Sequence, residues 1–167
     1  VWQASDLQAF WSDSLRDLAA TSGDLNAASL LARAREMAPA DAILTTETGI
    51  YNAVNLFVWK VTGPMSYFGS CGANIMGFSL PAAMAASLVR PAQKTVALVG
   101  DGGFLMRAPE LETAARLKLA PVIIVFNDGT LGLIRVKQQA KEYARTGVDL
   151  APTDFVRLAE SFGGRGW

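Results

Sequence analysis

Two kinds of segment alternate along the chain: short runs of consecutive apolar residues, and longer stretches in which apolar residues recur at helical spacing. The runs Thr95–Gly100 (TVALVG) and Pro121–Phe126 (PVIIVF) are typical of parallel strands buried on both faces. The segment Asp41–Thr46, which ends in β-branched residues, predicts another strand. Helices are predicted over 4–20, 26–37, 49–60, 78–89, 108–119, 130–144 and 152–162. Residues 62–72 are rich in turn-forming residues and predict a loop.

This alternation predicts an α/β fold, a doubly wound parallel sheet with helices on both faces. Residues 1–40 are interpreted as a helical lead-in from a preceding linker or domain, and residues 41–167 as the sheet domain. Because crossovers between parallel strands are right-handed, the strand-to-helix loops lie along one edge of the sheet, where such sheets bind ligands. Binding chemistry is therefore expected in the loops that follow the strands.

Composition narrows that chemistry. The 15 basic and 15 acidic residues cancel, so no charge excess indicates a nucleic-acid partner. The absence of histidine excludes Ser-His-Asp and Cys-His hydrolases and His-ligated zinc. The single cysteine, Cys71, excludes an internal disulfide and favours a reducing compartment, so a cytoplasmic location is expected. No apolar run is long enough for a membrane helix, so no membrane partner is expected either.

The first candidate binding loop is Gly100-Asp101-Gly102-Gly103, directly after the first apolar strand. Its glycines allow a sharp turn and a close approach of the backbone to a ligand. Backbone N–H groups exposed there, ahead of a helix, suit a phosphate. Asp101 is the only charge in the loop, and a carboxylate beside a phosphate requires a cation between them, for which Mg²⁺ is suited.

The second candidate loop is Asn127-Asp128-Gly129-Thr130, directly after the second apolar strand. Neighbouring strands of a sheet lie about 5 Å apart, so Asp101 and Asp128 are expected to face one ion. These two side chains, a backbone carbonyl and two phosphate groups would complete an octahedral site.

Ordinary turns are the alternative interpretation of both loops. Asp-Gly pairs are common turn residues, and Gly-Asp-Gly after a strand often arises by chance. A dinucleotide-binding fingerprint is absent, since Leu105 stands where its third glycine belongs. A Walker loop is absent too, because no Gly-Lys-Ser/Thr occurs. Two polar loops after two buried strands give the cofactor interpretation a weight equal to that of the turns.

Taken together, the loops resemble the diphosphate-binding domain of thiamine diphosphate-dependent enzymes. The motif of that family begins with Gly-Asp-Gly and ends in an asparagine pair about 27 positions after the aspartate, which is Asp128 here. Residues 72–86 (GANIMGFSLPAAMAA) are similar to acetolactate synthases and benzoylformate decarboxylase, and residues 142–164 to acetolactate synthases. The resemblance runs from about residue 41 to the end. It implies thiamine diphosphate and Mg²⁺ as cofactors and a domain truncated at its C-terminus.

The resemblance assigns roles position by position. Asp101, Asp128 and Thr130 match the metal ligands, Thr130 through its backbone oxygen; most members have Asn where Asp128 stands. Met76 matches the apolar residue that props the cofactor into its bent shape, although a core gap-filler is the simpler interpretation of a methionine. The implied cofactor-binding residues are Thr48, Gly49, Asn52, Asn74, Met76, Gly100, Asp101, Gly102, Gly103, Asn127, Leu131 and Leu133.

The loop after the first strand departs from the family pattern. Acetolactate synthases often carry Gln and His where this chain has Ile50 and Tyr51. The contact that these side chains make with the diphosphate is therefore expected from the backbone, Thr48 or Asn52.

The resemblance implies a lyase or transferase that decarboxylates or ligates 2-oxo acids. The biosynthetic acetolactate synthases place a Trp where this chain has Lys137, which argues against their particular substrate. Arg135, Lys137 and Gln138 either face a carboxylate substrate or form a solvated helix face. A benzoylformate decarboxylase-like enzyme and a non-catalytic cofactor-binding or assembly module are the alternatives.

No catalytic residue is assigned to this chain. In the family a glutamate on another domain, usually of a second subunit, activates the cofactor's aminopyrimidine; Glu47 lies in the wrong loop for that role. Because the cofactor carries its own base, the missing histidine is consistent with the resemblance. We expect a homo-oligomer, dimer or tetramer, formed through the cofactor site, and an isolated chain without turnover. The charged fraction of 18%, against about 25% in an average domain, agrees with faces that are covered by other domains or a partner.

Overall fold

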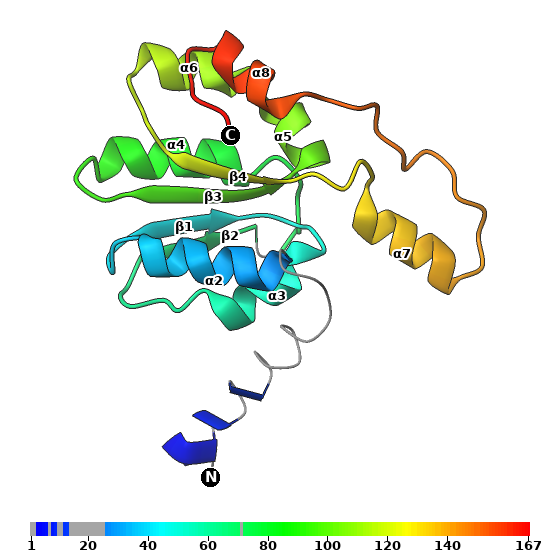
Figure 1. Cartoon of the computed structure of the whole chain (residues 1–167), viewed down its shortest axis with the longest axis horizontal. Helices are drawn as coiled ribbons and strands as arrows, with labels where there is room; N and C mark the ends of the chain where they lie inside the picture. The colour runs from blue at the N-terminus through cyan, green and yellow to red at the C-terminus, as the bar shows by residue number, and fades with distance from the viewer. Residues whose placement is uncertain (1–2, 7, 10–11, 14–25, 71) are drawn as a thin grey trace.

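A four-stranded parallel sheet forms the centre of the protein (Figure 1). The computed structural model describes residues 3–6, 8–9, 12–13, 26–70 and 72–167, so most of the helix predicted over 4–20 lies outside the described residues. The strands are β1 (Ile43–Thr46), β2 (Tyr67–Gly69), β3 (Thr95–Gly100) and β4 (Val122–Phe126). Their order across the sheet is β2-β1-β3-β4, and every neighbouring pair is parallel. The prediction of a parallel α/β sheet is confirmed.

Helices cover both faces of the sheet, as Figure 1 shows. One face carries α2 (Ala27–Met37) and α3 (Tyr51–Val58). The other carries α4 (Ser79–Val89), α5 (Asp101–Arg107), α6 (Glu110–Arg116) and α8 (Phe155–Ser161). The remaining helix, α7 (Gly132–Ala140), projects beyond the carboxyl end of β4. Within the described part of the chain, no helix is long and apolar enough to cross a membrane.

The strand β3 shows why an unbroken apolar run was a reliable predictor. Leu98 packs into the cluster under α2 and α3, whereas its neighbour Val99 packs into the cluster under α4, α5 and α6. Alternate side chains point to opposite faces, and both faces are covered, so both must be apolar. The strand β4 has the same alternation, but it lies at the edge of the described sheet, and its Val122 remains 53% exposed.

Two sequence-based boundaries were wrong. The predicted loop over 62–72 contains β2, which pairs with β1 through Leu44–Tyr67 and Thr46–Gly69. This strand has only three residues, so its pairing with β1 outweighs the turn-rich local composition. The predicted loop Gly100–Gly103 is the first turn of a helix, because α5 begins at Asp101 immediately after β3. Gly100 is the extended N-cap of that helix, and the predicted helix over 108–119 is the separate, shorter α6.

Candidate functional site

The segments that follow the carboxyl ends of β1, β3 and β4 meet, as the parallel topology predicts. A Cβ atom at position 102 would lie 2.8 Å from Leu131 Cδ2 and 3.0 Å from Met76 Cε. A Cβ atom at position 132 would lie 2.6 Å from Ile50 Cδ1 and 2.9 Å from Asp128 Oδ2. The glycines therefore leave the space that allows segments distant in the sequence to converge on one site.

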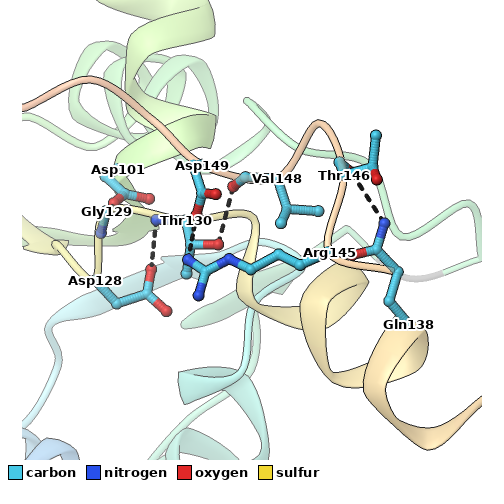
Figure 2. Close-up of polar contacts among 9 residues, drawn as sticks. All are labelled: Asp101, Asp128, Gly129, Thr130, Gln138, Arg145, Thr146, Val148 and Asp149. Atoms are coloured by element: carbon cyan, nitrogen blue, oxygen red, sulfur yellow. Dashed lines mark hydrogen bonds and ion pairs between the residues drawn. The ribbon is translucent and has the colours of Figure 1, made fainter. Parts of the chain in front are cut away.

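Asp101 ties two of these loops together. Its side chain is buried, with 4% exposure. The carboxylate accepts a hydrogen bond at Oδ2 from the Gly129 N–H (2.7 Å) and another at Oδ1 from the Gly102 N–H (2.7 Å). A carboxylate has about four lone-pair sites, so these two bonds leave lone pairs on both oxygens for a further ligand. Figure 2 shows Asp101 beside Gly129, at the start of the segment that leads to Thr130.

Asp128 is exposed, in contrast to Asp101. Its Oδ1 accepts a weak hydrogen bond from the Thr130 N–H at 3.4 Å, within its own loop (Figure 2). No group of three or more His, Cys, Asp or Glu side chains among the described residues is placed to hold a metal ion. Among the described residues, Asp101 and Asp128 are the predicted carboxylate ligands, and a cation here would also take backbone, phosphate or water oxygens.

The segment Gly129–Leu131 is held by a second stretch of chain. Thr130 Oγ1 donates to the Val148 carbonyl (2.9 Å), and the Leu131 N–H donates to the same oxygen (2.7 Å). The Leu150 N–H donates to the Gly129 carbonyl (2.9 Å). These bonds flank an antiparallel bridge between Thr130 and Asp149, and Figure 2 shows the two stretches side by side. Sequence reasoning missed Val148 and Leu150, although the similarity of residues 142–164 to acetolactate synthases pointed to this stretch.

The polar side chains of α7 and of the chain that follows it have different partners. Gln138 Nε2 donates to the Thr146 carbonyl (3.0 Å), which fastens α7 to the returning chain (Figure 2). Arg145 forms an ion pair with Asp149 on that returning chain. Gln138 therefore has a structural role in holding α7, which is neither of the two roles expected from the sequence, substrate contact or a solvated helix face. Lys137 is exposed and Arg135 half-buried.

In the loop after β1, Asn52 and Tyr51 are both engaged by the protein itself. Asn52 Oδ1 accepts hydrogen bonds from Thr46 Oγ1 (3.1 Å) and Asn55 Nδ2 (3.4 Å). Tyr51 is buried, its hydroxyl donates to the Leu98 carbonyl (3.3 Å), and its ring stacks on Phe126 with centroids 4.4 Å apart. Burial, and secondarily the charge of a nearby glutamate, raise the pKa of the Tyr51 hydroxyl well above its usual value. Tyr51 is thus a core residue in this structure.

The other predicted residues lie around this site with different exposure. Gly49 lies under the Tyr51 ring, because a Cβ atom there would be 2.2 Å from Tyr51 Cε1. Thr48 is half-buried. Three further predicted residues are exposed to solvent, namely Asn74, Asn127 and Leu133.

One buried polar residue of this region was set aside by the sequence analysis. Glu47 directly follows β1 and is buried, with 1% exposure. Its Oε2 accepts a hydrogen bond from the N–H of Ser79, the first residue of α4 (2.9 Å). Burial raises the pKa of the Glu47 carboxyl above its usual value of 4.5, while backbone N–H groups of Ser79, Gly77 and Phe78 act in the opposite direction. No signal in the sequence marks this role, because the partners are backbone groups 32 residues away.

Known proteins resemble this chain in sequence and in fold. Residues 47–167 match the family described as "Thiamine pyrophosphate enzyme, C-terminal TPP binding domain". The chain is 49% identical over 104 residues to the acetolactate synthase of Bacillus subtilis (strain 168), covering 62% of this chain and 18% of that protein. It is 35% identical over 137 residues to the acetolactate synthase isozyme 2 large subunit of Escherichia coli (strain K12), covering 80% of this chain and 25% of that protein.

A solved structure shows the same fold. The thiamine diphosphate-dependent 4-hydroxybenzoylformate decarboxylase of Rhodococcus jostii RHA1 superposes with a TM-score of 0.80 at 33% identity, over 89% of this chain and 28% of that one. The chain therefore spans between 18% and 28% of the length of these three relatives. With the family matched over most of its residues, the chain belongs to the thiamine pyrophosphate enzymes, whose C-terminal TPP binding domain it carries.

Proposed function

We propose that this domain binds thiamine diphosphate through Mg²⁺ and serves an acetolactate synthase-like enzyme that acts on 2-oxo acids. The observation that carries the proposal is Asp101, a buried carboxylate that joins the β3 and β4 loops and retains free lone pairs on both oxygens. A buried carboxylate at such a junction is well suited to a hard cation, because the cation compensates its charge.

The residues present fit the cofactor. The helix α5 begins at Asp101, and while the Gly102 N–H donates to Asp101 Oδ1, the Gly103 N–H has no acceptor four residues back within the helix and could serve a diphosphate oxygen. Gly102 leaves the space between Met76 and Leu131 free of its own side chain. Asp101, Asp128 and the Thr130 carbonyl would hold the metal. When bound, thiamine diphosphate supplies an electron sink for the carbanion formed from the 2-oxo acid.

Thermal unfolding with thiamine diphosphate, with and without Mg²⁺, tests the proposal. A ligand at a hundred times its dissociation constant stabilises the folded state by about 2.7 kcal/mol, which for a domain of this length raises the melting temperature by several degrees. We expect this rise only when both cofactor and Mg²⁺ are present. Asp101→Asn is expected to abolish it, whereas Asp41→Asn, at the opposite end of the sheet, is expected to preserve it. An equal rise without Mg²⁺, or with Asp101→Asn, would contradict the metal role.

The reaction of the whole protein is a further part of the proposal. The acetolactate synthases among the relatives favour carboligation of 2-oxo acids, and the 4-hydroxybenzoylformate decarboxylase favours decarboxylation as the second candidate. Assaying both products from one 2-oxo acid, with the natural full-length protein, would distinguish the two. A loaded site without either product would favour the non-catalytic assembly module, for which the buried Tyr51 is the supporting observation.

We also propose that the site is completed by a second copy of the chain in a cytoplasmic homo-oligomer. The support is that no residue of this chain matches the family's activating glutamate, so a group from elsewhere is required. Sedimentation of the full-length protein with and without cofactor would test this. Dissociation into monomers under conditions that sustain turnover would contradict it.

A further inference from the structure

Glu47 is a buried carboxylate that the proposed function does not use. Its Oε2 accepts the hydrogen bond from Ser79, but Oε1 is buried and has no hydrogen-bond partner among the described residues. Burying an incompletely satisfied carboxylate costs several kcal/mol, on the order of the penalties measured for unpaired polar groups. A role of Glu47 in the site would offset this cost.

The carboxylate of Glu47 lies between two helix starts. On one side, Ser79 and the two residues before it present their backbone N–H groups to the carboxylate at the start of α4. The partial positive charge of a helix N-terminus favours an anion there. On the other side, Oε1 lies against the first turn of α5, because a Cβ atom at position 103 would be only 1.7 Å from it. One side chain thus touches both helices from the end of β1.

A second polar contact fixes the start of α4 to β1. Thr45 Oγ1 donates to the Ser79 carbonyl (2.9 Å), and Ser79 Oγ donates to the Thr45 carbonyl (3.0 Å). Both residues are fully buried. Hydrogen bonds in such an environment are strong and specify one arrangement of the backbone. Ser79 is therefore fixed to β1 by Thr45 and to the Glu47 carboxylate by its own N–H, and the residues just before it follow from this fixed point.

That segment carries Met76. Met76 directly precedes Gly77, whose N–H acts on Glu47, and Met76 Cε lies 3.0 Å from where a Cβ of Gly102 would be. Gly102 in turn precedes Gly103, which lies against Glu47 Oε1. We propose that Glu47 is a positioning residue of the cofactor site, which ties residues 76–79 to the first turn of α5 and so sets the separation between Met76 and Gly102. Its functional meaning rests on the proposed binding of thiamine diphosphate at this place.

The arrangement itself can be tested without cofactor. The chain has five methionines, so ¹³C-methyl labelling gives a small set of NMR signals, and loss of one signal in Met76→Leu identifies Met76. We expect Glu47→Ala to shift or broaden the Met76 signal and Glu47→Gln to preserve it, because Gln retains an acceptor oxygen at the same reach. Leu31→Ala, in the core on the opposite face of the sheet, lowers stability without contacting the site and should leave the signal unchanged. An unchanged signal in Glu47→Ala, or an equal change in Leu31→Ala, would overturn the inference.

The consequence for the cofactor is measured by calorimetric titration of thiamine diphosphate in Mg²⁺. We expect Glu47→Ala to raise the dissociation constant about tenfold and Glu47→Gln to keep it within about threefold of the unmodified protein. If Glu47 had only a structural role, Glu47→Ala and Leu31→Ala would both lower the melting temperature, while the folded protein would bind thiamine diphosphate with an unchanged dissociation constant. That result would overturn the proposed role of Glu47 in cofactor binding. If the unmodified protein binds no cofactor, the proposed function fails, and the Met76 signal still decides the positioning role.

Discussion

The two glycines at the start of α5 are expected to respond differently to the same substitution. In Gly102→Ala the new methyl group would meet Leu131 Cδ2 at 2.8 Å and Met76 Cε at 3.0 Å, the free ends of flexible side chains. In Gly103→Ala it would meet Glu47 Oε1 at 1.7 Å and the Gly77 backbone nitrogen at 3.3 Å. The first neighbours can rotate away, whereas Glu47 is held by its hydrogen bond to the start of α4.

The expected energies follow from these contacts. Replacing glycine by alanine in a helix gains up to about 1 kcal/mol. At position 102 the displacement of a flexible side chain costs about 0.5–1.5 kcal/mol, so the net change in stability is near zero. At position 103 overpacking costs about 1–3 kcal/mol, and losing the charged hydrogen bond of Glu47 costs about 1.5–3 kcal/mol more. Gly103→Ala is therefore expected to destabilise by about 3 kcal/mol, which lowers the melting temperature of a domain of this length by about 6–12 °C.

Thermal and urea unfolding, followed by circular dichroism, would measure both variants beside Gly63→Ala, where a Cβ atom meets nothing within 4 Å. Gly102→Ala should have the same melting temperature as the Gly63→Ala control. It should bind thiamine diphosphate more weakly, because the side chains of Met76 and Leu131 have moved. In a Glu47→Ala background, Gly103→Ala should cost much less than in the unmodified protein, since the two residues contact each other and their effects are not additive. Equal stability of Gly102→Ala and Gly103→Ala would refute the reasoning.

Three further outcomes are expected. Burial raises the pKa of the Glu47 carboxyl above 4.5, so the folded state binds the carboxyl proton more tightly than the unfolded state. The free energy of unfolding should therefore fall as the pH rises from 4.5 through the folded-state pKa. Urea unfolding at several pH values should show this decrease in the unmodified protein and not in Glu47→Gln. Tyr51→Phe removes the hydroxyl bonded to Leu98 but keeps the ring on Phe126, and should cost about 1 kcal/mol or less in the same assay. Thr130→Val removes the bond to the Val148 carbonyl, costs about 1 kcal/mol, and should accelerate hydrogen exchange nearby.

The elements that could be predicted from the sequence are those in which every consecutive residue is apolar because both faces are buried. The strand Thr95–Gly100 was predicted at its observed bounds, because both of its faces are covered and every side chain is apolar. The strand Tyr67–Gly69 was not, because its three residues are ordered by pairing with β1 and not by their own pattern. The start of α5 was missed for a related reason: glycines disfavour helix in isolation, but here they permit close packing against Leu131 and Glu47.

The part of the site that could be predicted from the sequence consists of side chains that directly follow a predicted strand. Asp101 and its convergence with the β4 loop followed from two strands and their loops alone. Glu47 and Val148 were given no site role, because Glu47 accepts from a backbone N–H of a distant segment and Val148 contributes only its own backbone carbonyl, and such contacts leave no spacing in the sequence. The resemblance to the family placed Tyr51 at a position that holds diphosphate in relatives, and the structure instead buries it against Phe126.

The departure at Asp128 can be understood from what holds its loop. The β4 loop is fixed through the neighbours of Asp128: the Gly129 N–H binds Asp101, and Thr130 binds the Val148 carbonyl. Asp128 itself is exposed and makes only a 3.4 Å contact within the loop. Its side chain therefore contributes little to the position of the loop, and either Asp or Asn is compatible with this backbone. The exchange changes the charge offered to a cation while leaving the geometry of the other candidate ligands intact.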